Sequence, residues 1–242
     1  MGVSAPAAAK ANGLSTVVNV VTAPREAFET LRVVPMWGWA FVVAAALATL
    51  GQYLATPATI HALQSSWPAQ VAANPRLAAL TPEQQQHALD VTLGAMHYGW
   101  LIAPVSVLVV ALLQAVIMLV FRTAGKGDAT FKQLWCASMN VAVIGAGMYS
   151  LLAGLIAVVR GPASYNSILD ALRAVPSLAW LAQGAPVKIV AFLGAFNVVS
   201  VWGAIVLAIA MVWVAKVSKA NAASCAVVTT VLAGLYFFFT AR

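Results

Sequence analysis

Charged side chains are scarce in this chain, and long stretches have none. Only 8% of its 242 residues are Asp, Glu, Lys or Arg, whereas soluble domains carry about 25%. A helix needs roughly 20 apolar residues to cross the bilayer core, and a charge at that depth costs at least about 2.5–3.5 kcal/mol. Five uncharged runs reach this length, which indicates an all-α integral membrane protein, a bundle of five transmembrane helices. The runs are 33–67, 93–121, 133–159, 189–215 and 220–241.

The sequence also lacks the residue patterns that are typical of a proton-coupled carrier, a disulfide-bonded protein or an enzyme. No acidic residue lies at bilayer depth, which argues against a proton-coupled carrier. Cys136 and Cys225 both fall inside predicted spans, so we expect no structural disulfide. His87, Asp90 and His97 share one side of a predicted external helix, a pattern more typical of a solvated face than of a metal site. Since metalloprotease and nucleophile-elbow motifs are absent, we expect no enzyme, no metal and no cofactor.

The charge pattern predicts one transmembrane domain over 36–242 after an N-terminal segment, 1–35. The third and fourth spans exceed 25 residues and should therefore be tilted or bent. Gly145 and Gly147 would allow a bend in the third span. The predicted spans are 36–56, 98–121, 133–159, 187–215 and 221–240.

The basic residues predict the orientation of the chain. Lys and Arg are concentrated in the turns 122–132 and 216–219, on the same side as the N-terminal segment, and cytoplasmic loops are enriched in these residues. We therefore expect a multi-pass membrane protein with its N-terminus in the cytoplasm and its C-terminus outside. The net charge of +7 does not indicate nucleic-acid binding, because the cations are scattered and form no patch interleaved with aromatic residues.

The N-terminal segment has the pattern of an amphipathic helix. Apolar residues recur at helical spacing, and Pro24 can open a second short helix. We expect this segment to lie along the cytoplasmic interface or to cap the bundle as a lid. A candidate partner or lipid interface follows from its second half. The first apolar face consists of Leu14, Val17, Val18 and Val21, and the candidate interface of Arg25, Phe28, Leu31 and Arg32.

Two external connections contain helix start signals. Thr81 is followed by a proline and, three residues after it, by Gln84, a combination that predicts a helix from Pro82 to about His97. In the connection 160–187, apolar and charged residues lie on two different helix faces, which predicts a short interfacial helix after Asn166 or Ser167.

Small and amide side chains inside the spans indicate how the helices meet. Small residues recur at every fourth position, as in Ser150 and Gly154, and would let neighbouring backbones approach closely. An unpaired amide in hydrocarbon is costly, so Gln114, Asn140 and Asn197 should each find a partner across a helix contact or line a wet path. Convergence on a cavity would favour a permease, channel or lipid-moving protein. Dispersal into dry contacts would favour a scaffold.

Four short motifs resemble the Yip family, membrane proteins named in eukaryotes for interacting with Ypt/Rab GTPases, and its shorter bacterial members. The resemblance extends from about Leu14 to Thr240. The motifs are Ala-Pro-Arg-Glu-Ala-Phe-Glu at 23–29, Ala-Thr-Phe-Lys-Gln-Leu at 129–134, Phe-Asn-Val-Val-Ser-Val-Trp at 196–202 and Lys-Val-Ser-Lys-Ala at 216–220.

The resemblance implies a non-enzymatic scaffold or adaptor that contacts the lipid bilayer and other membrane proteins, or itself, in a bacterial plasma membrane. Two departures limit what is carried over from the family. The fourth-span motif has no acidic residue, and only about 35 residues precede the first span, where eukaryotic members have a long Pro- and Gly-rich region. We therefore do not carry over the Rab-linked trafficking role.

Overall fold

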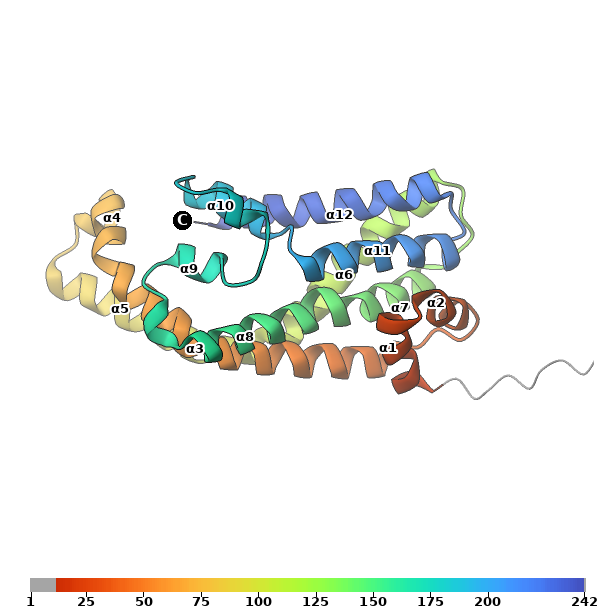
Figure 1. Ribbon diagram of the computed structural model, residues 1–242, viewed down its shortest axis with the longest axis horizontal. Helices are drawn as coiled ribbons and strands as arrows, with labels where there is room; N and C mark the ends of the chain where they lie inside the picture. The colour runs from red at the N-terminus through yellow and green to blue at the C-terminus, as the bar shows by residue number, and fades with distance from the viewer. Residues whose placement is uncertain (1–11, 242) are drawn as a thin grey trace, which may run out of the picture.

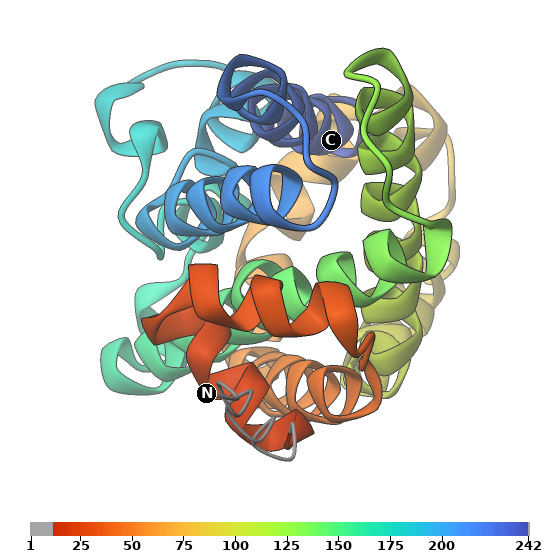
Figure 2. The ribbon, with the colours of Figure 1, turned by 90° about the vertical axis from the view of Figure 1, so that its right-hand side faces the viewer.

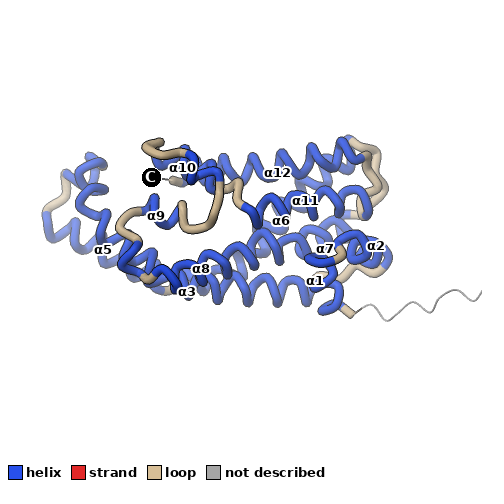
Figure 3. The backbone as a smooth tube through the Cα atoms, in the orientation of Figure 1, coloured by secondary structure: helices blue, strands red, loops and turns tan. Residues whose placement is uncertain are grey.

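The computed structural model describes residues 12–241, and its regular structure in that part of the chain is helical throughout (Figure 3). The long helices run along one axis and form an elongated bundle (Figure 1). The elements are α1 (Gly13–Thr22), α2 (Pro24–Val33), α3 (Gly38–Ala73), α4 (Pro75–Ala78), α5 (Pro82–His97), η1 (Gly99–Ile102), α6 (Ala103–Ala124), α7 (Phe131–Ala142), η2 (Val143–Met148), α8 (Tyr149–Arg160), η3 (Pro162–Ser164), α9 (Ile168–Leu172), η4 (Leu178–Leu181), α10 (Val187–Gly194), α11 (Val198–Trp213) and α12 (Lys219–Thr240).

Four helical stretches are long and apolar enough to cross a membrane. They imply a multi-pass membrane protein in contact with a lipid bilayer, because their outward faces carry exposed apolar side chains. The stretches are Gly38–Ala73, Gly99–Ala124, Phe131–Arg160 and Lys219–Thr240.

The structure does not confirm the fifth predicted span. Residues 187–215 form two shorter helices, α10 and α11, of 8 and 16 residues. At 1.5 Å per residue α11 is about 24 Å long, shorter than a hydrocarbon core of about 30 Å. The break lies at Asn197, whose side chain caps α11, and we had interpreted this residue only as a polar group inside a continuous helix.

The third predicted span stays continuous. Between α7 and α8 the six residues of η2 form a π-helical turn, in the place where we expected Gly145 and Gly147 to allow a bend. Gly147 lies against the backbone of Ala44 on α3, so a side chain there would meet the neighbouring helix. The wider turn therefore keeps the helix going while it changes which residues face α3.

The closest helix pair in the bundle is α3 with α8. Gly51 and Gly154 face each other so closely that a Cβ atom on either would collide with the backbone of the other helix. Ser150 belongs to the same contact, so the predicted small-residue face of the third span does pack on a neighbouring helix. Contacts of this kind are typical of helix pairs in membranes, where small residues let backbones approach.

The helix α3 extends well beyond the predicted span 36–56. It has 36 residues, about 54 Å, and continues through Pro57 and Pro68. Its far half packs against α5, α9 and η3, with Ala58 and Ala62 buried beside Tyr165. These contacts stabilise the helix past its two prolines, so it continues beyond the predicted end of the span at residue 56.

The predicted short helices are confirmed. Helix α5 covers Pro82–His97 with a capping box between Thr81 and Gln84. Helix α9 follows Ser167, which forms a capping box with Asp170. The N-terminal segment forms α1 and α2, which cross one end of the bundle; α5, α9, α10 and the C-terminal end lie toward the other end (Figures 1 and 2).

Candidate functional site

The apolar face of α2 is buried in the bundle. Phe28 and Leu31 are 0% exposed and belong to a core cluster with Leu134 of α7 and Met211 of α11. Helix α2 therefore caps the bundle as a lid, one of the two placements that we expected for the N-terminal segment. The partner or lipid interface that we predicted on α2 stays a prediction, but burial leaves Phe28 and Leu31 no surface to contribute to it.

Arg32 joins the lid to three other parts of the bundle. Its guanidinium donates two hydrogen bonds to the Asp128 carboxylate, at 3.0 and 2.8 Å, and one to the carbonyl oxygen of Val214 at the end of α11. The amide nitrogen of Gln133 donates to the carbonyl oxygen of Arg32 at 2.7 Å. The Arg32 hydrogen bonds hold the pKa of Asp128 below its ordinary value, and the same pair raises the pKa of Arg32.

Arg25 is the cation of α2 that stays on the outer surface. It forms an exposed ion pair with Glu29 at 3.1 Å and lies 4.2 Å from the ring centroid of Trp213, where Lys216 also approaches to 5.2 Å. A weak sequence signal for Asp128 is that it is the single acidic residue in the basic turn 122–132.

The helix α1 has apolar residues on two sides. Val17 and Val20 are buried against the bundle, whereas Leu14 and Val18 are 46% and 55% exposed. Trp39, at the start of α3, lies against Gly13 and is also exposed. An outward apolar side next to a tryptophan is typical of a helix in the membrane interface.

The three amides predicted to line a path make separate contacts. Gln114 on α6 accepts a hydrogen bond from Ser138 on α7 at 3.0 Å. Asn140 donates to the carbonyl oxygens of Met36 and Cys136 at 3.0 and 2.8 Å, while its own side-chain oxygen is buried without a partner. None of the hydrogen bonds among the described residues joins one of the three amides to another, and each joins different elements.

Asn197 organises the break between α10 and α11. Its side-chain oxygen accepts from the backbone N–H of Ser200 at 2.9 Å, and Ser200 Oγ accepts from the backbone N–H of Asn197 at 3.0 Å. The Asn197 amide nitrogen also donates to the carbonyl oxygen of Gly194 at 3.1 Å. The backbone N–H of Leu178, in the loop before α10, donates to the carbonyl oxygen of Phe196 at 3.2 Å. These bonds satisfy the polar groups that the break frees.

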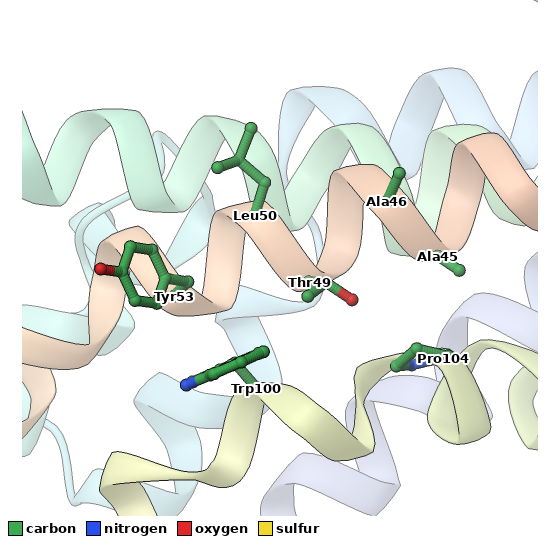
Figure 4. Close-up of a pocket in the computed structure, with 7 residues that line it drawn as sticks. All are labelled: Ala45, Ala46, Thr49, Leu50, Tyr53, Trp100 and Pro104. Atoms are coloured by element: carbon green, nitrogen blue, oxygen red, sulfur yellow. The ribbon is translucent and has the colours of Figure 1, made fainter.

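A groove lies between α3 and the start of the second long helix (Figure 4). The rings of Tyr53 and Trp100 form one end of it, with centroids 5.8 Å apart in an edge-on arrangement. Its volume is about 540 Å³. We call this feature the α3–α6 groove; it is lined by Ala45, Ala46, Thr49, Leu50, Tyr53, Trp100 and Pro104.

A second cavity adjoins the groove and shares Tyr53 and Trp100 with it. We call it the end cavity; its volume is about 630 Å³, and its polar lining includes His61, Gln64 and His97. His61 Nδ1 lies 3.0 Å from the carbonyl oxygen of Tyr165. Because a carbonyl oxygen can only accept, Nδ1 is the donor of this bond. The sequence indicates only a solvated face for His97 and therefore does not predict this cavity.

Comparison of the chain with models of protein families, with curated proteins and with solved structures gave no match. Among the described residues, His, Cys, Asp and Glu side chains form no group of three that could hold a metal ion.

Proposed function

We propose that the chain crosses the bilayer five times, with α10 and α11 forming one discontinuous crossing. The two helices follow α12 along its length: α11 packs on its first half, and the Phe192 ring of α10 lies against Gly234 near its end. Broken helices are tolerated at membrane depth where protein buries the freed backbone, as the Asn197 and Leu178 bonds do here.

Five crossings put the two ends of the chain on opposite sides. The turns at the lid end carry Lys126, Lys132, Lys216 and Lys219, and this supports a cytoplasmic lid and an external C-terminus. We propose this orientation, and we propose a bacterial plasma membrane as the location of the protein.

We propose that the protein is a non-enzymatic scaffold or adaptor of the Yip type, which binds other membrane proteins or lipids. The observation that carries this proposal is the dispersal of Gln114, Asn140 and Asn197 over separate contacts, because a transport path needs its polar groups to face one cavity. Neither the α3–α6 groove nor the end cavity is lined by any of the three. On this proposal, the surface offered to a protein partner is the outer face of α2 around Arg25 and Glu29.

Photo-cross-linking in intact cells tests the scaffold proposal. A photoreactive amino acid at position 29 should give an adduct of one discrete size, because Glu29 lies on the outer face of α2. Arg25→Glu should remove the adduct without changing the amount of full-length protein. Position 83, at the start of α5, is the matched control at the other end. Absence of a discrete adduct from positions 25, 26 and 29 alike would contradict the proposal.

A permease, channel or lipid-moving protein is the second candidate, and the broken crossing is the observation that favours it. Discontinuous helices form substrate and ion sites in many transporters. In vesicles, this candidate requires ion, dye or phospholipid movement above the rate of empty vesicles. It also requires Gln114→Leu to abolish that movement without lowering the melting temperature. The scaffold proposal expects no movement above the empty vesicles.

A further inference from the structure

We infer that the α3–α6 groove and the end cavity together bind one zwitterionic phospholipid, with an acyl chain in the groove and the head group in the end cavity. This inference goes beyond the scaffold proposal and does not rest on it, because the two features lie away from α2. Three observations carry it: the depth of the groove, the polarity change along it and the charge of its lining.

Depth follows from the position of the lining residues on α3. Ala46 lies about 12 Å along the helix from Gly38, and Tyr53 about 22 Å. His61 lies about 35 Å from Gly38, which places it beyond a hydrocarbon core of about 30 Å but within the head-group layer of a bilayer about 40–45 Å thick. The groove therefore runs from the hydrocarbon to the head-group level when α3 enters the core near Gly38.

Polarity changes along the same direction. At the deep end Ala45, Ala46, Leu50 and Pro104 offer apolar contact to an acyl chain, and the hydroxyl of Thr49 is the one polar side-chain group there. A groove on a lipid-facing surface loses dispersion contacts if it stays empty, so a chain filling it is favoured. At the other end Gln64 and His97 line the end cavity, and their side chains make no hydrogen bond to any described residue. Their donors and acceptors are available to a phosphate and its ester oxygens.

The charge of the lining selects the head group. Among the described residues, no Lys, Arg, Asp or Glu lines the end cavity, so its lining offers no fixed charge to balance a net anionic lipid. The rings of Tyr53, Tyr98 and Trp100 can attract an ammonium group through their faces. A head group that carries both a phosphate and an ammonium, with no net charge, therefore fits the cavity best.

Native mass spectrometry of the full chain in detergent tests the inference by lipid titration. The two titrants are phosphatidylethanolamine and phosphatidylglycerol with the same acyl chains. We expect the first phosphatidylethanolamine to bind at least about tenfold more tightly than the first phosphatidylglycerol. Ala46→Trp should fill the groove and weaken the first phosphatidylethanolamine by about tenfold or more. Val227→Trp, at an exposed position of α12, is the matched control and should leave binding unchanged.

The head-group end has its own variant. Gln64→Ala with His97→Ala should reduce the preference for phosphatidylethanolamine over phosphatidylglycerol to within about twofold, while the chain stays folded because neither side chain makes an internal bond. If Ala46→Trp lowers the melting temperature, Ala46→Leu takes its place as a smaller filler. Equal affinity of the two lipids for the unmodified protein would overturn the inference. So would unchanged binding in the folded groove variant.

Discussion

The third and fourth predicted spans have similar lengths and no charged residue apart from Lys188 near the start of the fourth, yet the chain folds them differently. The third stays one helical rod, α7–η2–α8, because a π-helical turn absorbs the extra residues and Gly147 and Gly154 pack on α3. The fourth breaks into α10 and α11, because Asn197 and Ser200 cap a new helix start inside it. Length and hydropathy do not distinguish the two cases. The two cases are distinguished by the capping pair inside the fourth span and by the glycines of the third span that pack against a neighbouring backbone.

In the proposed arrangement of five crossings, these two crossings are held together at the lid end. Arg32 bonds to Asp128 just before α7 and to Val214 just after α11, and Phe28 packs between the same helices. The two crossings therefore differ in structure toward the end of the bundle that lies opposite the lid. The variants below act on the shared lid, on the continuous crossing and on the broken one.

Removing the Phe28 ring should have the largest effect. Phe28→Ala leaves a cavity where the lid meets both crossings, at a typical cost of about 3–5 kcal/mol. Thermal unfolding in detergent measures it. Val33→Ala on the same helix is the control, since Val33 is 79% exposed and should be nearly neutral. A melting temperature within error of the unmodified protein would mean that α2 does not hold the two crossings.

Overpacking the continuous crossing should come next. Gly154→Leu places a side chain against the backbone of Gly51, so we expect the upper part of the usual range of about 1–3 kcal/mol for overpacking. Gly145→Leu is the matched control, since nothing lies near its Cβ position. The measurement is again the melting temperature. If the two glycine variants lowered the melting temperature equally, the close contact between α3 and α8 would not be the cause of the loss of stability.

Removing the cap of the broken crossing should have a smaller effect. Asn197→Ala deletes the side chain that caps α11, for which about 0.5–2 kcal/mol is typical. Ser200→Ala removes the reciprocal bond, and the double variant should cost less than the sum because both residues act in one motif. Strict additivity in such a double-mutant cycle would show that the capping box does not act as a unit.

The Arg32–Asp128 pair should produce the smallest effect, visible as a dependence on pH. The pKa of Asp128 is lowered by its bonds from Arg32, so the pair stabilises the folded state above the ordinary Asp pKa of about 3.9. This stabilisation is lost as the pH falls through the lowered pKa. The melting-temperature difference between the unmodified protein and Asp128→Asn should be constant from pH 7 to about 5 and shrink below about pH 4. A difference that grows toward acidic pH would contradict the assignment.

Part of this fold could be predicted from the sequence for clear physical reasons. Charge exclusion from the hydrocarbon predicts the apolar helices, the capping pattern that begins at Thr81 predicts α5, and the spacing of apolar and charged residues predicts α9. The break at Asn197 carried the same kind of signal, an Asn followed three residues later by Ser, but the surrounding hydropathy outweighed it. The extension of α3 past Pro57 and the facing of Gly51 with Gly154 depend on segments far apart in the chain, so no local pattern shows them. The lining of the end cavity is missed for the same reason, because His61 and His97 meet there from two different helices.

The central claim is that the chain makes a discontinuous fifth crossing. It is tested most directly by measuring on which side of the membrane the loop before α10 lies. Single cysteines at positions 184 and 216, on a background lacking Cys136 and Cys225, can be labelled with a membrane-impermeant reagent in intact cells and in inverted vesicles. The account expects opposite sides: position 184 labelled from outside the cell and position 216 from the cytoplasmic side, together with position 126. Labelling of positions 184 and 216 from the same side would show that α10 and α11 do not cross, and the discontinuous fifth crossing would be lost.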